Sequence, residues 1–269
     1  MSNILVVDNT GQSGGAADFC ENSAFLFNTV LPASSVSGAN EDPDYPFDNC
    51  TDFPDNTKYS PLPSSGTVVI EFNQGIAQQI NAFGLAIHNA QSAGLYAKLE
   101  NWNGTGWDLI TDFTSLQDNK PFMHVFDAAE SRRQRLTLTF TSKLYIGTIF
   151  IGKAIVGLST PSLGFQPAKF APLDEVEQFT TEGNNTVMGR RIARGWQAKG
   201  SFDYVTFDRL DEFYQDFQNW VLDSKPLFFK WSNLRDEVVF GRQNPDRLTK
   251  PTYKTPLHST IEFEINGYQ

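Results

Sequence analysis

Residues 136–140 read Leu-Thr-Leu-Thr-Phe, and this stretch decides which fold the sequence predicts. Apolar and polar side chains alternate strictly, which indicates a β-strand with one buried and one exposed face. Similar runs recur at short spacing, with turns such as Asn103-Gly104 between them, over residues 67–72, 80–89, 95–102, 107–113, 122–126 and 144–156. This spacing favours an antiparallel β-sandwich over alternating strand and helix units.

The C-terminal part of the sequence contains one predicted helix. Four large apolar residues recur there at intervals of three and four, which gives a helix one apolar face: Leu210, Phe213, Phe217 and Trp220. We expect the helix over residues 208–222, with Asp208 as its N-cap and Pro226 after its end. Strand-like segments flank it at residues 197–207, 227–231, 238–240 and 260–265. This predicts an α+β domain in which one helix covers an antiparallel sheet.

Glycine and proline gather between residues 157 and 175, which is typical of a domain boundary. A length of 269 residues also favours two domains. We expect an N-terminal segment and β-sandwich over residues 1–158, with its core at about 45–158. A linker over 159–175 and a second domain over 176–269 complete the division.

Charge and composition exclude several classes of partner. The net charge of -10 repels phosphate backbones, so nucleic acid is not expected to bind. No stretch approaches the 18 consecutive apolar residues of a membrane span, and insertion into a membrane is not expected. Cys20 and Cys50 are too few for a disulfide framework, and no secretory segment precedes them. We expect free thiols and synthesis in a cytoplasm.

Motifs for catalysis are weak in this sequence. Gly11-Gln12-Ser13-Gly14-Gly15 fits G-x-S-x-G, but a protease-like serine needs a preceding histidine, and none occurs before His88. His88, His124 and His258 lie far apart, without the spacing of metal ligands. We expect no enzyme activity, cofactor or metal, while a hydrolase using unrecognised carboxylates stays an open alternative.

An acidic, proline-rich stretch covers residues 41–55 and contains no basic residue. Carboxylates and carbonyl oxygens from an irregular loop suit calcium. However, Glu41-Asp42-Pro43-Asp44 lacks the order of an EF-hand loop, so a solvated loop is favoured.

Two groups of side chains are candidates for binding. Tyr96, Trp102 and Trp107 are candidate glycan contacts, because exposed aromatic rings stack on sugars; aromatic residues of β-domains are also common core residues. Arg190, Arg191 and Arg194 form a basic cluster. This cluster is either a solvated turn or a contact with an acidic neighbouring subunit, where guanidinium groups pair with carboxylates.

Two stretches resemble known families. Residues 45–158 resemble the discoidin-like, galactose-binding-type jelly-roll β-sandwich of phage virion proteins. The resemblance is carried by Tyr45-Pro46-Phe47-Asp48-Asn49-Cys50-Thr51-Asp52, Phe83-Gly84-Leu85-Ala86-Ile87-His88-Asn89 and the strand 145–152. Residues 176–268 are similar to the barrel domain of phage distal-tail and minor tail proteins. That likeness is carried by Gly189-Arg190-Arg191, the helix, Pro226-Leu227-Phe228-Phe229-Lys230-Trp231 and Ile261-Glu262-Phe263-Glu264-Ile265.

The resemblance implies a non-catalytic structural subunit of a phage tail tip or baseplate. Such a subunit forms a homo-oligomeric ring, here expected to be a hexamer, and contacts the tail tube and tail hub proteins. Phe228, Phe229 and Trp231 join the three arginines as expected interface residues. The protein would be assembled in the host cytoplasm and located in the virion. The alternative is a carbohydrate-binding adhesin module that contacts a host surface glycan.

Overall fold

The structure is a computed structural model that describes residues 23–29, 31, 42–51, 57–114, 116, 118–158, 165, 172–180, 186–232, 237–245 and 251–268, with the backbone alone between 172 and 194. Most of the described residues lie in two β-sheets, and one α-helix accompanies them. The expected fold class, mainly β with one helix, is therefore confirmed. No helix in this part of the chain is long and apolar enough to cross a membrane.

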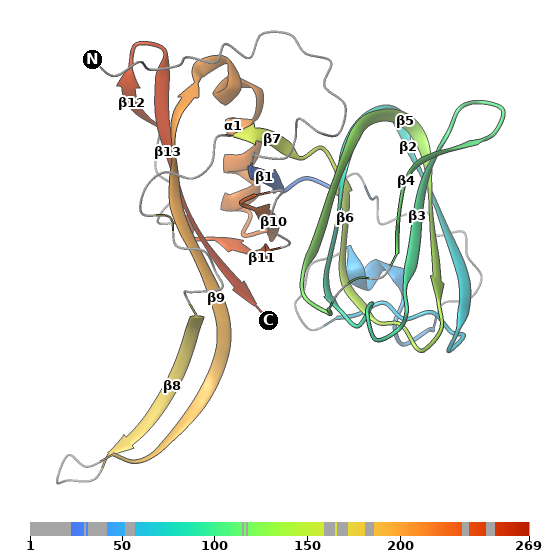
Figure 1. Cartoon of the computed structure of the whole chain (residues 1–269), viewed down its shortest axis with the longest axis horizontal. Coiled ribbons are helices and arrows are strands. Elements are labelled where there is room, and N and C mark those ends of the chain that lie inside the picture. Colours follow the sequence, from blue (N-terminus) through green and yellow to red (C-terminus); the bar gives the residue numbers. More distant parts are fainter. Residues whose placement is uncertain are drawn as a thin grey trace, which may run out of the picture.

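The first sheet has five strands in the order β4-β3-β5-β2-β6. Their bounds are Gly66–His88 for β2, Tyr96–Trp102 for β3, Trp107–Thr114 for β4, Phe122–Phe140 for β5 and Ile146–Gly152 for β6. β3 pairs with the C-terminal half of β5, whereas β6 pairs with the C-terminal half of β2. The two long strands therefore pass from one layer of the sandwich to the other, arching over its end (Figure 1).

The sequence predicted two short strands where each of these long strands lies. Residues 67–72 and all but the last residue of 80–89 fall in the single strand β2, and residues 122–126 and 136–140 fall in β5. The pairing continues between them, as Gln78 opposite Ser131 and Gln79 opposite Glu130 show, with register shifts on both sides. Backbone hydrogen bonds do not require apolar side chains, so polar residues carry the strands around the arch.

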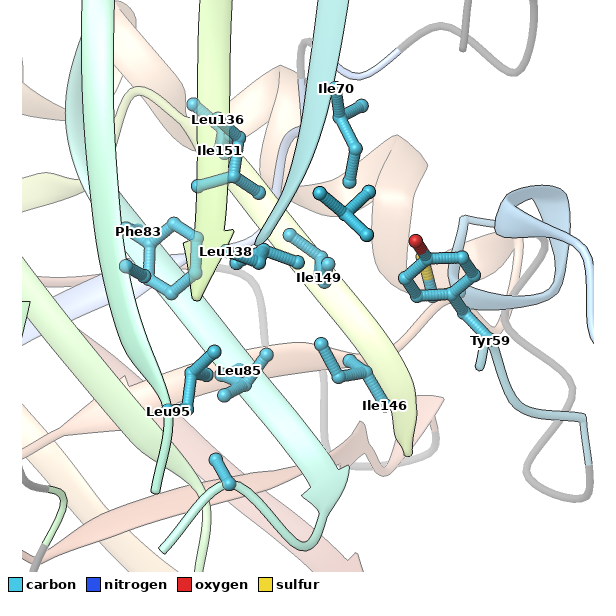
Figure 2. Packing of buried hydrophobic residues seen from close by; sticks show 14 of the residues in the cluster. Tyr59, Ile70, Phe83, Leu85, Leu95, Leu136, Leu138, Ile146, Ile149 and Ile151 are labelled. Carbon is cyan, nitrogen blue, oxygen red and sulfur yellow. The ribbon is translucent and has the colours of Figure 1, made fainter. Parts of the chain in front are cut away.

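The core of the sandwich is filled from both layers. Figure 2 shows leucine and isoleucine side chains of β5 and β6, among them Leu138 and Ile149, lying between Phe83 on one side and Tyr59 on the other. Ile70, Phe83, Leu85, Leu138 and Ile149 are all completely buried. Because these residues come from opposite layers, alternation along each strand supplies one continuous apolar interior.

The second sheet has eight strands, seven of which follow the order β7-β1-β10-β11-β13-β9-β8, while β12 pairs with β13. The bounds are Ser23–Leu26 for β1, Ile155–Leu158 for β7, Pro172–Thr180 for β8, Thr186–Thr206 for β9, Leu227–Lys230 for β10, Val238–Gln243 for β11, Thr252–Thr255 for β12 and His258–Tyr268 for β13. β1 and β7 lie within the range 1–158 expected for the N-terminal unit, yet they pair in this sheet. β8 begins inside the expected linker.

The helix α1, Phe207–Leu222, agrees with the expected range of 208–222 and packs on this sheet. Its N-cap is Thr206, not Asp208 as the sequence predicted. Asp208 instead lies in the first turn, where its negative charge favours the helix N-terminus without capping it.

The two sheets pack against each other through β1 and β10. Along β1, Phe25 faces the helix, while Ala24 and Leu26 join an apolar cluster with the sandwich. On β10, Phe229 likewise packs on the helix side of the sheet, and Phe228 joins the apolar cluster with the sandwich. Helix, eight-stranded sheet and sandwich therefore form three successive layers. The approach is close, because a Cβ on Gly84 would lie 2.8 Å from the ring of Phe228.

Candidate functional site

An aromatic pair lies on the outer face of the sandwich, at the end of the β3–β4 hairpin. Trp102 and Trp107 face each other across the two strands, with ring centroids 5.3 Å apart and planes at 65°. Both side chains are partly exposed. We call the surface formed by these two residues and the side chains around them the tryptophan surface.

The turn between the two tryptophans is held by one side chain. Oδ1 of Asn103 accepts hydrogen bonds from the backbone amides of Thr105 and Gly106, at 2.9 and 2.8 Å. Its Nδ2 donates to both carboxylate oxygens of Asp108, at 2.9 Å. Gly104 adopts φ 102°, which a side chain would strain. The local sequence Asn-Gly-Thr-Gly thus fixes the direction in which the indole rings leave the sheet.

Two guanidinium groups lie over the indole rings. Arg133 Cζ is 5.3 Å from the ring centroid of Trp102 and 5.2 Å from that of Trp107. Arg135 Cζ is 4.5 Å from the ring of Trp107. Cations at these distances are attracted by the aromatic quadrupole. The arginines therefore stabilise the tryptophan pair, and they also occupy part of the ring surface that a sugar would need.

The arginines are neutralised by carboxylates on neighbouring strands. Arg133 forms an ion pair with Glu71 at 2.6 Å, and Arg135 forms one with Glu100 at 2.6 Å. Glu100 is buried and also accepts from Lys98. Burial alone would raise the pKa of Glu100, but the hydrogen bonds from Lys98 and Arg135 outweigh it and hold that pKa below its ordinary value. Glu100 is thus an ionised structural carboxylate, unsuited to act as a general acid at neutral pH.

Tyr96 does not belong to the tryptophan surface. It lies at the opposite end of β3, six residues from Trp102, which corresponds to about 20 Å along a strand. Its hydroxyl is 3.2 Å from Asp112 Oδ2, and partial desolvation followed by the charge of Asp112 raises the pKa of Tyr96. Of the three expected glycan contacts, Trp102 and Trp107 therefore lie together, and Tyr96 lies apart from them.

The three expected interface arginines lie on β9, where it pairs with β8. Arg190 is the register partner of Glu177, Arg191 of Val176, and Arg194 of Asp174. The register thus places residues of opposite charge opposite each other at two of these three positions. The cluster therefore lies on a strand, so the alternative of a solvated turn is wrong, whereas the contact with a neighbouring subunit stays a prediction.

This part of the sheet extends away from the rest of the molecule (Figure 1). β13 pairs with β9 only from Gly195 onward, so residues 186–194 of β9 have β8 as their only partner among the described strands. We call this two-stranded ribbon, residues 174–180 and 186–194, the arm.

The expected interface residues on β10 have a different environment. Phe228 and Phe229 are completely buried, one on each side of the eight-stranded sheet. The prediction that they contact another subunit is corrected, because a short apolar run in a strand covered on both faces is core. Trp231 follows β10 and is partly exposed, with its Nε1 donating to Glu237 at 3.1 Å.

Titratable clusters suited to a metal do not occur among the described residues. His88 is buried, Nε2 of His124 is 3.0 Å from the Thr111 hydroxyl, and Nδ1 of His258 is 3.0 Å from Thr255. Of the acidic stretch that suggested calcium, Asp42 pairs with Lys143 at 3.6 Å.

Cys50 lies in a short 3-10 helix, Phe47–Cys50, and its buried thiol donates a hydrogen bond to the carbonyl of Phe47. Cys20, Glu41, residues 52–56 and the Gly11–Gly15 motif lie outside the described residues.

Sequence reasoning missed the residues around the tryptophan pair. Arg133 and Arg135 are two positions apart on β5, so the period of a strand places them on one face. The sequence therefore contained a signal that the two arginines share a face. Their proximity to Trp102 and Trp107 could not be predicted from the sequence, because it depends on the pairing of β3 with β5.

Comparison with known proteins gave matches in structure only. No protein-family model and no curated protein matches the sequence. A chitosan-binding module from a chitosanase/glucanase of Paenibacillus sp. IK-5 is 18% identical, covers 47% of this chain and 99% of its own, and has a TM-score of 0.39. A family 32 carbohydrate-binding module from Clostridium perfringens NanJ, in complex with galactose, is 14% identical, covers 50% and 99%, and has a TM-score of 0.38.

A Ruminococcus gnavus fucosidase, in complex with fucose, is 14% identical with a TM-score of 0.39. The match covers 48% of this chain and 27% of the fucosidase. The binding modules are discoidin-like β-sandwiches, the class that the sequence predicted. These similarities concern the fold alone.

Proposed function

We propose that this chain is a non-catalytic structural subunit that assembles with further copies of itself by means of the arm. The observation that carries the proposal is the two-stranded ribbon of β8 and β9 beyond Gly195. An isolated two-stranded ribbon is marginally stable in water, because it has no third strand or helix on which to bury a face. A neighbouring subunit would supply that missing support.

Register and charge support this reading. The arm has seven residues of β8 and nine of β9, and its register places Asp174 opposite Arg194 and Glu177 opposite Arg190. The outer edges of the ribbon offer backbone groups for strand addition. A ring of identical subunits needs two different complementary surfaces on each copy, and a projecting arm is a suitable first surface.

The place of the assembly comes from the sequence resemblance. Similarity of residues 176–268 to the barrel domain of distal-tail and minor tail proteins supports a phage tail tip or baseplate, in contact with tail tube and tail hub proteins. Location in the virion and a hexameric ring are part of the same proposal.

Light scattering coupled to size exclusion tests the proposal directly. In the test variant, residues 177–190 are replaced by Asn-Gly, which closes a two-residue turn between the register partners Val176 and Arg191. We expect the unaltered protein to be an oligomer and the shortened protein to be a monomer with the same thermal midpoint. A monomeric unaltered protein, both alone and with tail tube protein, would refute the proposal.

A second candidate function is glycan binding at the tryptophan surface. Trp102 and Trp107 are partly exposed and held in place by a fixed turn, as rigid stacking residues need to be. The arginines over the rings leave less aromatic surface free, which is why assembly is the leading proposal.

Titration with galactose and with chitosan oligomers, followed by tryptophan fluorescence and calorimetry, tests the second candidate. Trp107→Ala should abolish binding, whereas Tyr45→Ala, which removes an exposed aromatic ring elsewhere, should leave it unchanged. Binding that survives Trp107→Ala would exclude the tryptophan surface as the site.

A further inference from the structure

The turn between Trp102 and Trp107 contains an Asn-Gly dipeptide that is open to solvent. Asn103, Gly104 and Thr105 are exposed, and nothing lies within 4 Å of the position that a Cβ on Gly104 would take. In an Asn-Gly dipeptide, the backbone nitrogen of glycine can attack the side-chain amide carbon of asparagine, because no Cβ obstructs the approach. The reaction releases ammonia and is called deamidation. Its rate in a folded chain depends on the groups around the reacting atoms.

The side-chain oxygen of Asn103 is already surrounded by donors. Its Oδ1 accepts hydrogen bonds from the amide of Thr105 at 2.9 Å, from the hydroxyl of Thr105 at 3.0 Å and from the amide of Gly106 at 2.8 Å. Attack on Cγ of Asn103 moves negative charge onto this oxygen. Donors that are in place before the charge develops stabilise it without reorganisation, as in an oxyanion hole.

The leaving nitrogen has a carboxylate beside it. Nδ2 of Asn103 contacts both carboxylate oxygens of Asp108 at 2.9 Å. This nitrogen gains a proton before it leaves as ammonia, and a carboxylate stabilises the positive charge that the nitrogen then bears. The nucleophile is accessible as well, because no acceptor among the described residues bonds to the backbone amide of Gly104. A stabilising group therefore lies at each atom of the Asn103 amide where charge develops.

We infer that Asn103 deamidates in the folded protein, with the backbone nitrogen of Gly104 as nucleophile. This nitrogen gives its proton to water, a bond forms between it and Cγ of Asn103, and the bond from Cγ to Nδ2 breaks. Ammonia leaves with a proton from water, and a succinimide ring remains. Water then opens the ring at either carbonyl carbon, which gives aspartate or isoaspartate. In the net reaction an amide and water become a carboxylate and ammonium, without an oxidant or a reductant.

The product changes the tryptophan surface. A carboxylate at position 103 faces the carboxylate of Asp108, so repulsion between like charges replaces the two donated hydrogen bonds. Isoaspartate also adds its Cβ to the main chain, which lengthens the loop that joins Trp102 to Trp107. Both effects separate the indole rings, whose centroids are 5.3 Å apart before the reaction. Deamidation is thus an irreversible switch of this surface, and it does not depend on assembly through the arm.

The second Asn-Gly dipeptide of the chain is an internal control. Asn266 and Gly267 lie in β13 between β9 and β11, and Nε2 of Gln197 donates to Oδ1 of Asn266 at 3.2 Å. A Cβ on Gly267 would lie 2.7 Å from the carbonyl oxygen of Phe240, so this glycine is closely packed. Its nitrogen therefore cannot approach the side chain of Asn266 unless the sheet opens.

Peptide mapping by mass spectrometry, during incubation at mildly alkaline pH, tests the inference. In the folded protein we expect conversion at Asn103 and an intact Asn266. In urea we expect conversion at both sites, with Asn103 reacting more slowly than it does in the folded chain. Asp108→Asn should slow the conversion of Asn103 about tenfold, which is the effect of losing one hydrogen bond to a charged group. Asp112→Asn, which removes an exposed carboxylate from the same strand, should leave the rate unchanged.

An Asn103 that stays intact in the folded protein, while both sites react in urea, overturns the inference. A rate at Asn103 that is equal in the folded and unfolded chains, or unchanged by Asp108→Asn, overturns the assistance by the turn. Thr105→Ala, which removes the hydroxyl donor, replaces Asp108→Asn if that variant is not folded by near-UV circular dichroism, and the same slowing is expected.

Tryptophan fluorescence reports the effect on the tryptophan surface. The emission of the unaltered protein should change in step with conversion of Asn103, and Asn103→Asp should show an altered spectrum from the start. Complete conversion without a spectral change overturns the proposed switch of the surface, even where the deamidation itself is observed.

Discussion

Lowering the pH should destabilise this protein through His88. The side chain is 8% exposed at the end of β2, and its Nδ1 accepts a hydrogen bond from the amide of Ala90 at 3.2 Å. Burial lowers the pKa of His88 from 6.5 to about 4, and a backbone hydrogen bond with Lys120 and the charge of Asp118 oppose the shift only in part. Protonation of Nδ1 would break the bond to Ala90 and bury a charge.

The sign and size of the effect follow from these two pKa values. Between pH 4 and 6.5 the unfolded chain binds a proton that the folded chain does not, so the free energy of unfolding falls as the pH falls. For this one group, the loss from pH 7.5 to pH 5 is about 2 kcal/mol. Over the whole interval it approaches about 3 kcal/mol, at roughly 1.4 kcal/mol for each unit of pKa.

Urea unfolding of the unaltered protein and of His88→Asn, at both pH values, provides the measurement. His124, whose pKa is lowered by burial and by the charge of Lys230, titrates in both proteins and cancels in the comparison. We expect His88→Asn to lose about 2 kcal/mol less than the unaltered protein on acidification. Equal losses in the two proteins would refute the reasoning.

Three further changes test the packing and the ion pairs. Phe150→Ala should lower the free energy of unfolding by about 3–5 kcal/mol in urea, because the fully buried ring contacts Phe228 between the two sheets; a loss below about 1 kcal/mol would contradict that packing. Glu100→Gln should cost about 2 kcal/mol by the same assay, since it removes the charged acceptor of Arg135, and an unchanged midpoint would contradict this. Tyr204→Gly should raise the thermal stability of the monomer by about 1 kcal/mol through relief of its positive φ, and a lower melting temperature would argue against strain.

The binding surfaces were only partly predictable from the sequence. Trp102 and Trp107 could be selected as exposed aromatic residues, because a two-residue period and an Asn-Gly turn place them at a hairpin end. The arm could not be predicted, since residues 172–180 show no clear alternation and pair only because β9 continues beyond β13. The exposure of Tyr204 was missed for a related reason, because this residue lies at a register shift between β9 and β13.

Local periodicity accounts for what could be predicted about the fold. A strand repeats every two residues and a helix every 3.6, so residues 136–140 and the helix over 207–222 carry their own signatures. Neither signature depends on distant residues. The mainly-β class, the single helix and the antiparallel arrangement all follow from signals of this kind.

Which elements pack together was decided by residues that are distant in the sequence. The run Leu227–Phe229 is equally apolar whether it lies at an interface or inside, and both of its faces are buried only because the helix packs on one side of its sheet and the sandwich on the other. In the same way, residues 23–26 complete a sheet whose other strands follow residue 154. Hydrophobic burial is non-directional, so an apolar run indicates that its side chains will be buried. Which element buries them is decided only by the tertiary structure.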